Sequence, residues 1–195
     1  KPDLTVVLSD ASSTLAGALV SFYHRIPVVH IEAGCRTNNI YSPFPEEVNR
    51  RMIAPLASFH FPATQRAREN LLREGVDKKR VFFVGSTEPD AIYWILKNTS
   101  SRELYKIIPD FGRMKNIVVI TTHRRESWGK PLSEVFVALK SIAACSPNIH
   151  FIYSIHPNPL VLQPALKVLS QLKNLMIIPH IPAMPFIHLV ARASL

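Results

Sequence analysis

The feature that most constrains the fold of this chain is a regular alternation of short apolar segments with longer helix-forming segments. Such alternation predicts an α/β fold in which parallel strands are joined by right-handed helical crossovers. We predict strands at residues 4–9, 27–31, 59–61, 81–84, 117–121, 149–153 and 175–178. We predict helices at residues 11–23, 46–56, 65–74, 90–97, 131–144, 159–172 and 184–192, and one short helix after Ser100.

The alternation is interrupted once, at residues 109–115, where Pro109, Asp110 and Gly112 stand among basic residues. We take this break as a domain boundary. Each part then offers an incomplete sheet, and the second has only three predicted strands. The hydrophobic content of 47% fits parallel strands that are buried on both faces.

The charge balance favours an anionic partner. Lys and Arg number 23 against 14 Asp and Glu, a formal net charge of +9. Nucleotide phosphates would suit this balance, although an ordinary solvated basic surface explains it equally well. The basic residues are dispersed and have no aromatic residues between them, which argues against a dedicated nucleic-acid binder.

Several other classes of protein are disfavoured. No apolar run reaches the roughly 18 residues that a membrane span needs, and no signal peptide is visible, so we expect no membrane partner and a cytoplasmic location. Two cysteines are too few for a disulfide framework or a zinc site. The glycine-rich patterns GxGxxG and GxxxxGK[ST] are absent, so backbone cradling of a dinucleotide or triphosphate is not encoded.

Charged and imidazole side chains stand where predicted strands end. Ligands of open α/β sheets bind beyond the carboxyl ends of the strands. This rule selects carboxylates, histidines and arginines that could hold an anion and move protons: Asp10, Glu32, His123, Arg124, Arg125 and His156, with Glu46 at the start of the helix downstream of Glu32.

Each candidate also has an ordinary structural explanation. Asp10 could cap the following helix, and Glu32 could pair with the nearby Arg36. Glu46 could simply complement a helix dipole. His123 could be an ordinary loop histidine, and the segment 156–159 could be only a turn. Five further histidines, at positions 24, 60, 150, 180 and 188, are predicted as surface or packing residues.

One segment, HIEAGCRTNNIYSPFPEEVNRR at residues 30–51, closely resembles the non-hydrolysing UDP-N-acetylglucosamine 2-epimerase family. The family pattern is near H-x-E-A-G-L-R-T-x-x-x-x-S-P-x-P-E-E-x-N-R. The segments ATQRARENLLREGV, THRRESWGKPL and HPNP are also similar to this family, so the resemblance extends over nearly the whole chain.

The resemblance implies a GT-B-like fold with two Rossmann-like parallel-sheet domains and an active site in the cleft between them. Residues 1–110 would be the C-terminal part of the first domain, and residues 111–195 the N-terminal part of the second. Both domains would be incomplete, because family members are much longer and this chain resembles their middle.

The resemblance also implies an activity: interconversion of UDP-GlcNAc and UDP-ManNAc at C2, in the service of cell-surface polysaccharide biosynthesis. UDP would be eliminated to leave 2-acetamidoglucal and then added back. The matching positions imply catalytic roles for Asp10, Glu32, Glu46 and His123. Those that would bind the substrate, or a second and regulatory UDP-GlcNAc, are Arg36, Arg50, Arg124 and His156. No metal or redox cofactor is implied, and the full-length protein would be a homodimer.

The chain departs from the family in two places. Ser9-Asp10-Ala11 replaces the usual G-D-T, and Glu88-Pro89 replaces two apolar residues after Gly85. Three alternative functions therefore stay open. They are a GT-B glycosyltransferase, a hydrolysing epimerase, and a non-catalytic remnant that binds a sugar nucleotide or a partner.

Overall fold

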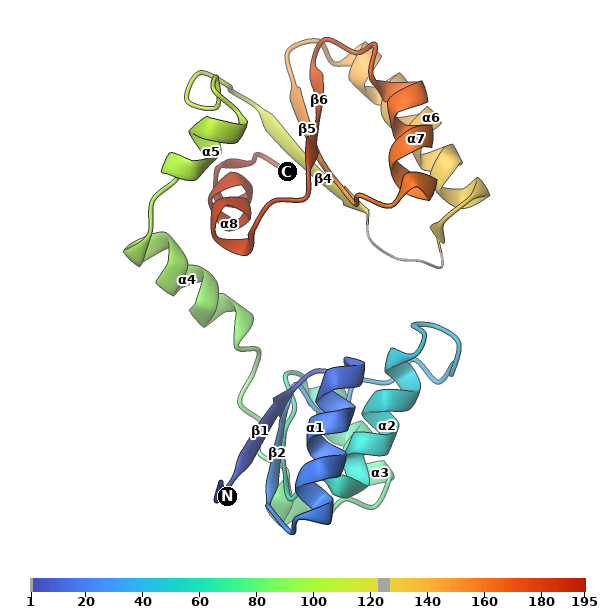
Figure 1. Ribbon diagram of the computed structural model, residues 1–195, viewed down its shortest axis with the longest axis vertical. Helices are drawn as coiled ribbons and strands as arrows, with labels where there is room; N and C mark the ends of the chain where they lie inside the picture. Colours follow the sequence, from blue (N-terminus) through green and yellow to red (C-terminus); the bar gives the residue numbers. More distant parts are fainter. Residues whose placement is uncertain (1, 123–126) are drawn as a thin grey trace. The chain divides into compact units, whose positions relative to one another are not determined.

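The computed structural model describes residues 2–122 and 127–195, which divide into two compact units between Pro89 and Asp90. In the described residues, each unit contains a three-stranded parallel sheet (Figure 1). The predicted α/β class with parallel sheets is therefore confirmed. The units divide before the predicted boundary because residues 104–111 pack into the second core. The assignment of 1–110 and 111–195 to two family domains stays a prediction.

The first unit has the sheet order β1-β2-β3. Helices α1 and α2 cover one face of this sheet, where Val7 and Val28 pack against Ile53. On the opposite face the side chains of Val6 and Leu8 remain 57% and 55% exposed. Its elements are β1 (Thr5–Leu8), α1 (Ser12–Tyr23), β2 (Val28–Ile31), α2 (Glu46–Leu56), β3 (Phe59–Phe61), α3 (Gln65–Arg73) and the 3-10 helix η1 (Lys78–Arg80).

The predicted strand at residues 81–84 is wrong. Only one bridge forms there, between Val81 and His60, with the Phe82 N–H donating to the His60 carbonyl. In a parallel ladder the next bond would need the N–H of residue 62, which is a proline and has none. The ladder therefore ends after one step.

The second unit has the sheet order β4-β5-β6, and helices cover both faces. Helices α6 and α7 pack on one face, and α5 and α8 on the other. Its elements are α4 (Glu88–Asn98), which starts just before the division, α5 (Arg102–Ile107), β4 (Ile117–Thr122), α6 (Lys130–Cys145), β5 (His150–Ile155), α7 (Pro159–Leu169), β6 (Leu175–Pro179) and α8 (Ala183–Arg192).

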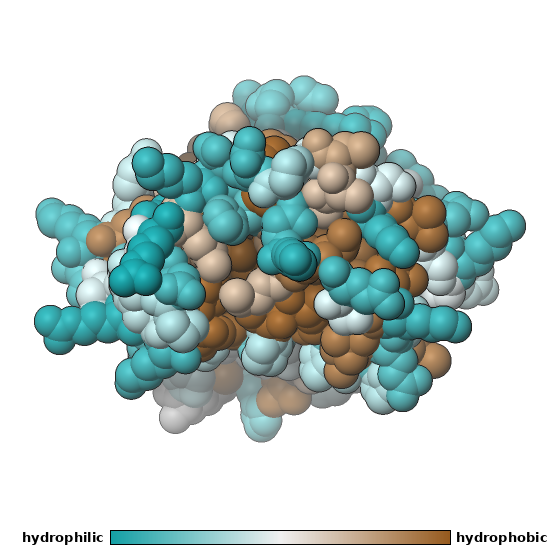
Figure 2. Space-filling model, turned by 90° about the horizontal axis from the view of Figure 1, so that it is seen from above, coloured by the Kyte–Doolittle hydropathy of each residue, from teal (hydrophilic) through white to brown (hydrophobic). Residues whose placement is uncertain are grey.

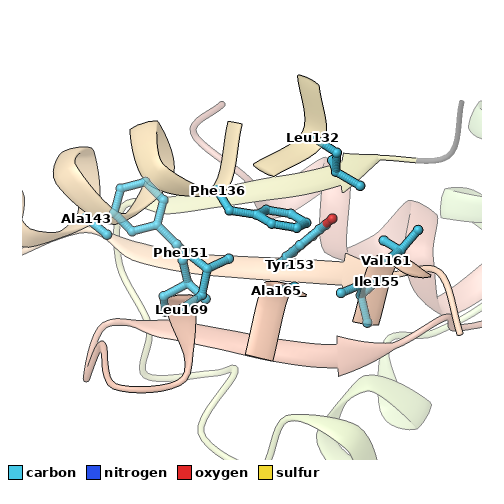
Figure 3. Close-up of a cluster of buried hydrophobic side chains, with 10 residues drawn as sticks. Leu132, Phe136, Ala143, Phe151, Tyr153, Ile155, Val161, Ala165 and Leu169 are labelled. Atoms are coloured by element: carbon cyan, nitrogen blue, oxygen red, sulfur yellow. The ribbon is translucent and has the colours of Figure 1, made fainter. Parts of the chain in front are cut away.

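The larger of the two cores in the second unit lies between its sheet and helices α6 and α7 (Figure 3). The Phe136 and Tyr153 rings pack with their centroids 6.1 Å apart. The buried Tyr153 hydroxyl forms a hydrogen bond with Thr122, so its polar atom has a partner inside the core. Burial raises the pKa of Tyr153.

The surface mixes charged and apolar side chains. On the face seen in Figure 2, apolar side chains (brown) lie in the middle and hydrophilic ones (teal) surround them. In the described parts of the chain, no helix has both the length and the apolar character needed to cross a membrane.

The loop after β2 passes so close to α3 that it requires a glycine. Gly34 has φ +86°, and a Cβ atom built there would lie 2.2 Å from the Ala67 carbonyl oxygen. Gly75 has a similar φ of +88°, but a Cβ atom there would meet nothing within 4 Å. Substituting alanine at each of the two positions therefore distinguishes the cost of a left-handed backbone from the cost of a steric clash.

Gly34→Ala should lower the free energy of unfolding by about 3 kcal/mol or more, because it adds a clash with backbone to the conformational cost. Gly75→Ala should cost only about 1 kcal/mol, the conformational part alone. Denaturant unfolding of both variants measures the difference. Equal losses would show that the close approach of the loop to α3 does not constrain the fold.

Candidate active site

A small cavity lies at the carboxyl ends of β1 and β2. Its volume is about 160 Å³, and it is lined by Ser9, Asp10, Glu32, Cys35 and Arg50. The structure thus brings together three of the residues selected from the sequence: Asp10, Glu32 and Arg50. The rule that ligands bind beyond the carboxyl ends of parallel strands describes this place well.

Both strands end in the same unusual backbone conformation. Ser9 follows β1 and Glu32 follows β2, and each has φ +62°. Left-handed conformations cost a non-glycine residue on the order of 1–3 kcal/mol and are concentrated at functional sites. The left-handed Ser9 also explains why a glycine suits this position in the G-D-T pattern.

Asp10 forms an ion pair with Arg50, with 2.5 Å between Asp10 Oδ2 and Arg50 Nη2. The two side chains are 23% and 11% exposed, so the pair is largely shielded from water. The helix cap after β1 is Ala11, without a side-chain hydrogen bond, so the interpretation of Asp10 as a helix cap is wrong. Arg50 Nε is buried and has no partner among the described residues.

Glu47 is a fully buried carboxylate that our sequence reasoning missed. It accepts hydrogen bonds from the Thr37 and Asn38 N–H groups at 2.9 and 3.2 Å and from Arg51 Nε at 2.9 Å. Burial alone would raise the Glu47 pKa, but these hydrogen bonds outweigh it and the pKa is lowered. Its spacing from Arg50 and Arg51, three and four residues along a helix, was the signal that could have revealed it.

Arg36 is bound within the protein. Its Nε and Nη2 donate to the two carboxylate oxygens of Glu74, both at 2.7 Å, and Nη1 donates to the Cys35 carbonyl. The side chain is only 2% exposed. The interpretation of Glu32 as the ion-pair partner of Arg36 is therefore wrong, since Glu74 holds that place.

Glu46 and Glu32 lie differently with respect to the cavity. Glu46 is the first residue of α2, is partly exposed and is not part of the lining. Glu32 lines this cavity and also a smaller one of about 70 Å³. The smaller cavity is otherwise lined by Leu8, Ile31, Ala63, Gly85, Ser86, Thr87 and Glu88. Glu88, one of the residues at which this chain departs from the family pattern, therefore lines this smaller cavity.

His156 lies in the second unit, directly after β5. Its Nδ1 accepts a hydrogen bond from the Asn158 N–H at 3.1 Å, and Asn158 in turn caps α7. Its ring packs 5.7 Å from that of Trp128, whose buried Nε1 has no partner in the described part of the chain. His123, Arg124 and Arg125 lie outside the described residues.

Two buried histidines lie side by side on the sheet of the first unit. His30 on β2 and His60 on β3 are register partners and are 1% and 0% exposed. His30 Nε2 donates to the Ser9 carbonyl at 2.8 Å, whereas neither ring nitrogen of His60 has a partner among the described residues. Burial, and then the charges of His30, Arg80 and Arg36, lower the His60 pKa to about 4.

The described residues contain no cluster of three or more His, Cys, Asp or Glu side chains that could hold a metal ion. The chemistry this cavity can support uses two carboxylates, a guanidinium and a thiol. Burial raises the pKa of the Cys35 thiol, which favours its protonated form.

Comparison with known proteins decides the family. The family model for UDP-N-acetylglucosamine 2-epimerase matches residues 1–195, the whole chain. The chain belongs to the UDP-N-acetylglucosamine 2-epimerase family. It is 39% identical over 200 residues to the UDP-N-acetylglucosamine 2-epimerase of Salmonella typhimurium, and this match covers 100% of the chain and 53% of the relative.

Solved structures of this epimerase family share the fold. The UDP-GlcNAc 2-epimerase of Neisseria meningitidis, solved bound to UDP-GlcNAc, matches with a TM-score of 0.86 at 34% identity, over 98% of this chain and 53% of that one. A putative epimerase from Listeria monocytogenes matches with a TM-score of 0.89 at 33% identity, over 98% and 50% of the two chains. The predicted GT-B-like class is confirmed, and the chain spans about half the length of these relatives.

The buried His60 should make the stability of this epimerase-family chain depend on pH. Its pKa of about 4 lies below the ordinary 6.5, so the unfolded chain takes up the proton first as the pH falls. The contribution of His60 to the free energy of unfolding should fall by about 2 kcal/mol between pH 7 and pH 5. Urea unfolding measures the free energy of unfolding at both pH values. In His60→Leu this free energy should fall less between pH 7 and pH 5, by about the same 2 kcal/mol. An unchanged fall would contradict the contribution of His60.

The two cysteines should differ in reactivity. Cys145 is exposed, whereas Cys35 is half-buried and has a raised pKa, so less of it is thiolate. At pH 8 iodoacetamide should alkylate Cys35 about tenfold or more slowly than Cys145. Mass spectrometry of single-cysteine variants, Cys145→Ser and Cys35→Ser, measures both rates. Equal rates would show that the cavity does not shield the thiol.

Proposed function

We propose that the full-length protein interconverts UDP-GlcNAc and UDP-ManNAc by inverting C2, without net hydrolysis. Family membership and the names of the curated relatives support this reaction. The observation that carries it is the cavity in which Asp10, Glu32 and Arg50 meet at the strand ends. Two carboxylates and a cation are the groups that a reversible elimination of a nucleoside diphosphate needs.

The proposed reaction begins when a carboxylate removes the proton from C2. The C2–H electron pair forms the C1=C2 double bond, and the C1–O bond breaks with its electron pair leaving on UDP. The intermediate is 2-acetamidoglucal. In the second half, UDP adds back at C1 and C2 receives a proton on its opposite face. Inversion therefore needs an acid or base on each side of the ring, which Asp10 and Glu32 can supply.

Arg50 is proposed to provide positive charge at the cavity. Its Nη2 is engaged by Asp10, and its side chain is 11% exposed and lines the cavity, so that its positive charge can act on a substrate oxygen there. Donors fixed before the reaction stabilise developing negative charge most effectively in a shielded site. The matching of His123, Arg124 and His156 to family positions supports their proposed role in binding UDP-GlcNAc or its diphosphate.

Glu46 and Arg36 are proposed to have different roles. Glu46 stays a proposed third acid or base, supported by its position in the E-E-x-N-R motif alone. Arg36 is proposed to stabilise the loop after β2, because all three of its guanidinium nitrogens already bind Glu74 and the Cys35 carbonyl.

The cavity of about 160 Å³ is smaller than typical ligand pockets, so only the C2 region of the sugar would enter it.

The decisive reaction is exchange of the C2 hydrogen of UDP-GlcNAc with solvent. In D₂O the full-length protein should place deuterium at C2 while the sugar stays on UDP. Glu32→Gln should slow this exchange about 10²- to 10⁴-fold, because it removes an acid or base of similar shape. Proton NMR measures the exchange, and Glu69→Gln on α3 is the matched control that should keep the wild-type rate.

Three results would contradict the proposal. Near-wild-type exchange in Glu32→Gln would remove Glu32 from the chemistry. Release of free ManNAc and UDP in place of UDP-ManNAc would identify the hydrolysing reaction. Binding of UDP-GlcNAc without any C2 exchange by the full-length wild type would identify a non-catalytic binder.

A further inference from the structure

The backbone around Asp10 is held from both sides by buried side chains that do not line the cavity. Ser9 lies in a left-handed conformation with φ +62°, and Asp10 follows it before α1 begins. Neither residue belongs to a strand or a helix, although the Ser9 N–H donates to the Ile31 carbonyl at 3.1 Å. Their carbonyl groups are instead fixed by two side chains, one from β2 and one from α2.

The first contact comes from β2. His30 Nε2 donates a hydrogen bond of 2.8 Å to the Ser9 carbonyl oxygen. A carbonyl can only accept, so the hydrogen must be on Nε2, and His30 is the tautomer that donates from this nitrogen. Burial lowers the pKa of His30, which keeps the ring neutral. The ring is 1% exposed, and its strand β2 is the central strand of the sheet, so its donor has one fixed direction.

The second contact comes from α2. Asn49 Nδ2 donates to the Asp10 carbonyl oxygen at 2.8 Å, and Asn49 is only 6% exposed. Its neighbour Arg50 holds the Asp10 carboxylate at the same time. Asp10 is thus fixed through its own carbonyl, its side chain and the carbonyl before it.

We propose that His30 and Asn49 are positioning residues that hold the Asp10 carboxylate at the distance from Glu32 that the reaction needs. This rests on the proposed function of the cavity. Neither residue lines the cavity, so neither is expected to touch substrate. They act by holding the Ser9–Asp10 backbone in a conformation that a serine does not adopt by preference.

The free energy that the left-handed turn costs is comparable to the free energy that these hydrogen bonds supply. A left-handed serine costs on the order of 1–3 kcal/mol, and one hydrogen bond returns about 1 kcal/mol. Loss of either bond therefore leaves the turn able to relax. A displacement of about 1 Å in a reacting group can cost about 100-fold in rate.

The test uses variants of the full-length protein that remove each hydrogen bond, each with a matched control. His30→Leu removes the donor, and His30→Gln keeps an N–H at similar reach. The matched control is His60→Leu, which changes the buried register partner of His30 that holds no carbonyl. Asn49→Ala removes the second donor. Its control is Asn174→Ala, because Asn174 binds backbone carbonyls of the second unit, to which Asp10 does not belong.

We expect the kcat for C2 exchange to fall about 10- to 100-fold in His30→Leu and Asn49→Ala, with KM changed less than about threefold. His30→Gln should recover most of the rate. His60→Leu and Asn174→Ala should keep the wild-type kcat, whatever they do to the melting temperature. A structural role alone would alter stability without separating kcat from KM in this way.

Three outcomes overturn the inference. His30→Leu and Asn49→Ala could both keep the wild-type kcat, His60→Leu could lose as much kcat as His30→Leu, or His30→Gln could fail to recover. If His30→Leu does not fold, Asn49→Ala and His30→Gln decide the question. Absence of exchange in the wild type is a different result, because it contradicts the proposed function and not the positioning.

Discussion

The first unit depends on one buried carboxylate, Glu47. Three hydrogen bonds from the loop after β2 and from Arg51 satisfy it, and a buried carboxylate left without them would be severely destabilising. Because Glu47 is on α2, these bonds join the start of that helix to the loop that follows Glu32. They also fix where Asn49 and Arg50 emerge from α2. The geometry at Asp10 therefore follows from an interaction that lies outside the cavity.

The cavity lies where two strands end, and the backbone at both strand ends adopts a conformation that costs free energy. Ser9 and Glu32 both leave their strands through a left-handed turn, which turns the chain sharply into the cavity region. Gly34 then lets the loop pass within contact distance of α3. Buried donors and the Arg36–Glu74 ion pair compensate for the conformational cost. These contacts hold the cavity lining in place, which suits the proposed reaction with a carboxylate on each side of one carbon atom.

Much of this architecture could be predicted from the sequence because its signals are local. The strand–helix alternation gave the parallel sheets, and the strand-end rule selected Asp10 and Glu32. The false strand at 81–84 had the right composition, but its partner lacked the N–H at Pro62. Glu47 and His30 were missed because their roles come from groups distant in sequence, the backbone of residues 37–38 and of Ser9. No periodicity in the chain reports such contacts.

The central claim is that the reacting carbon of the sugar lies between Asp10 and Glu32. The most direct measurement is a crystal structure of the full-length Glu32→Gln variant with UDP-GlcNAc bound, because this variant should bind substrate without consuming it. We expect C2 to lie within about 4 Å of the side-chain oxygens or nitrogen at both positions 10 and 32. A sugar whose C2 lies beyond reach of either side chain would contradict this claim.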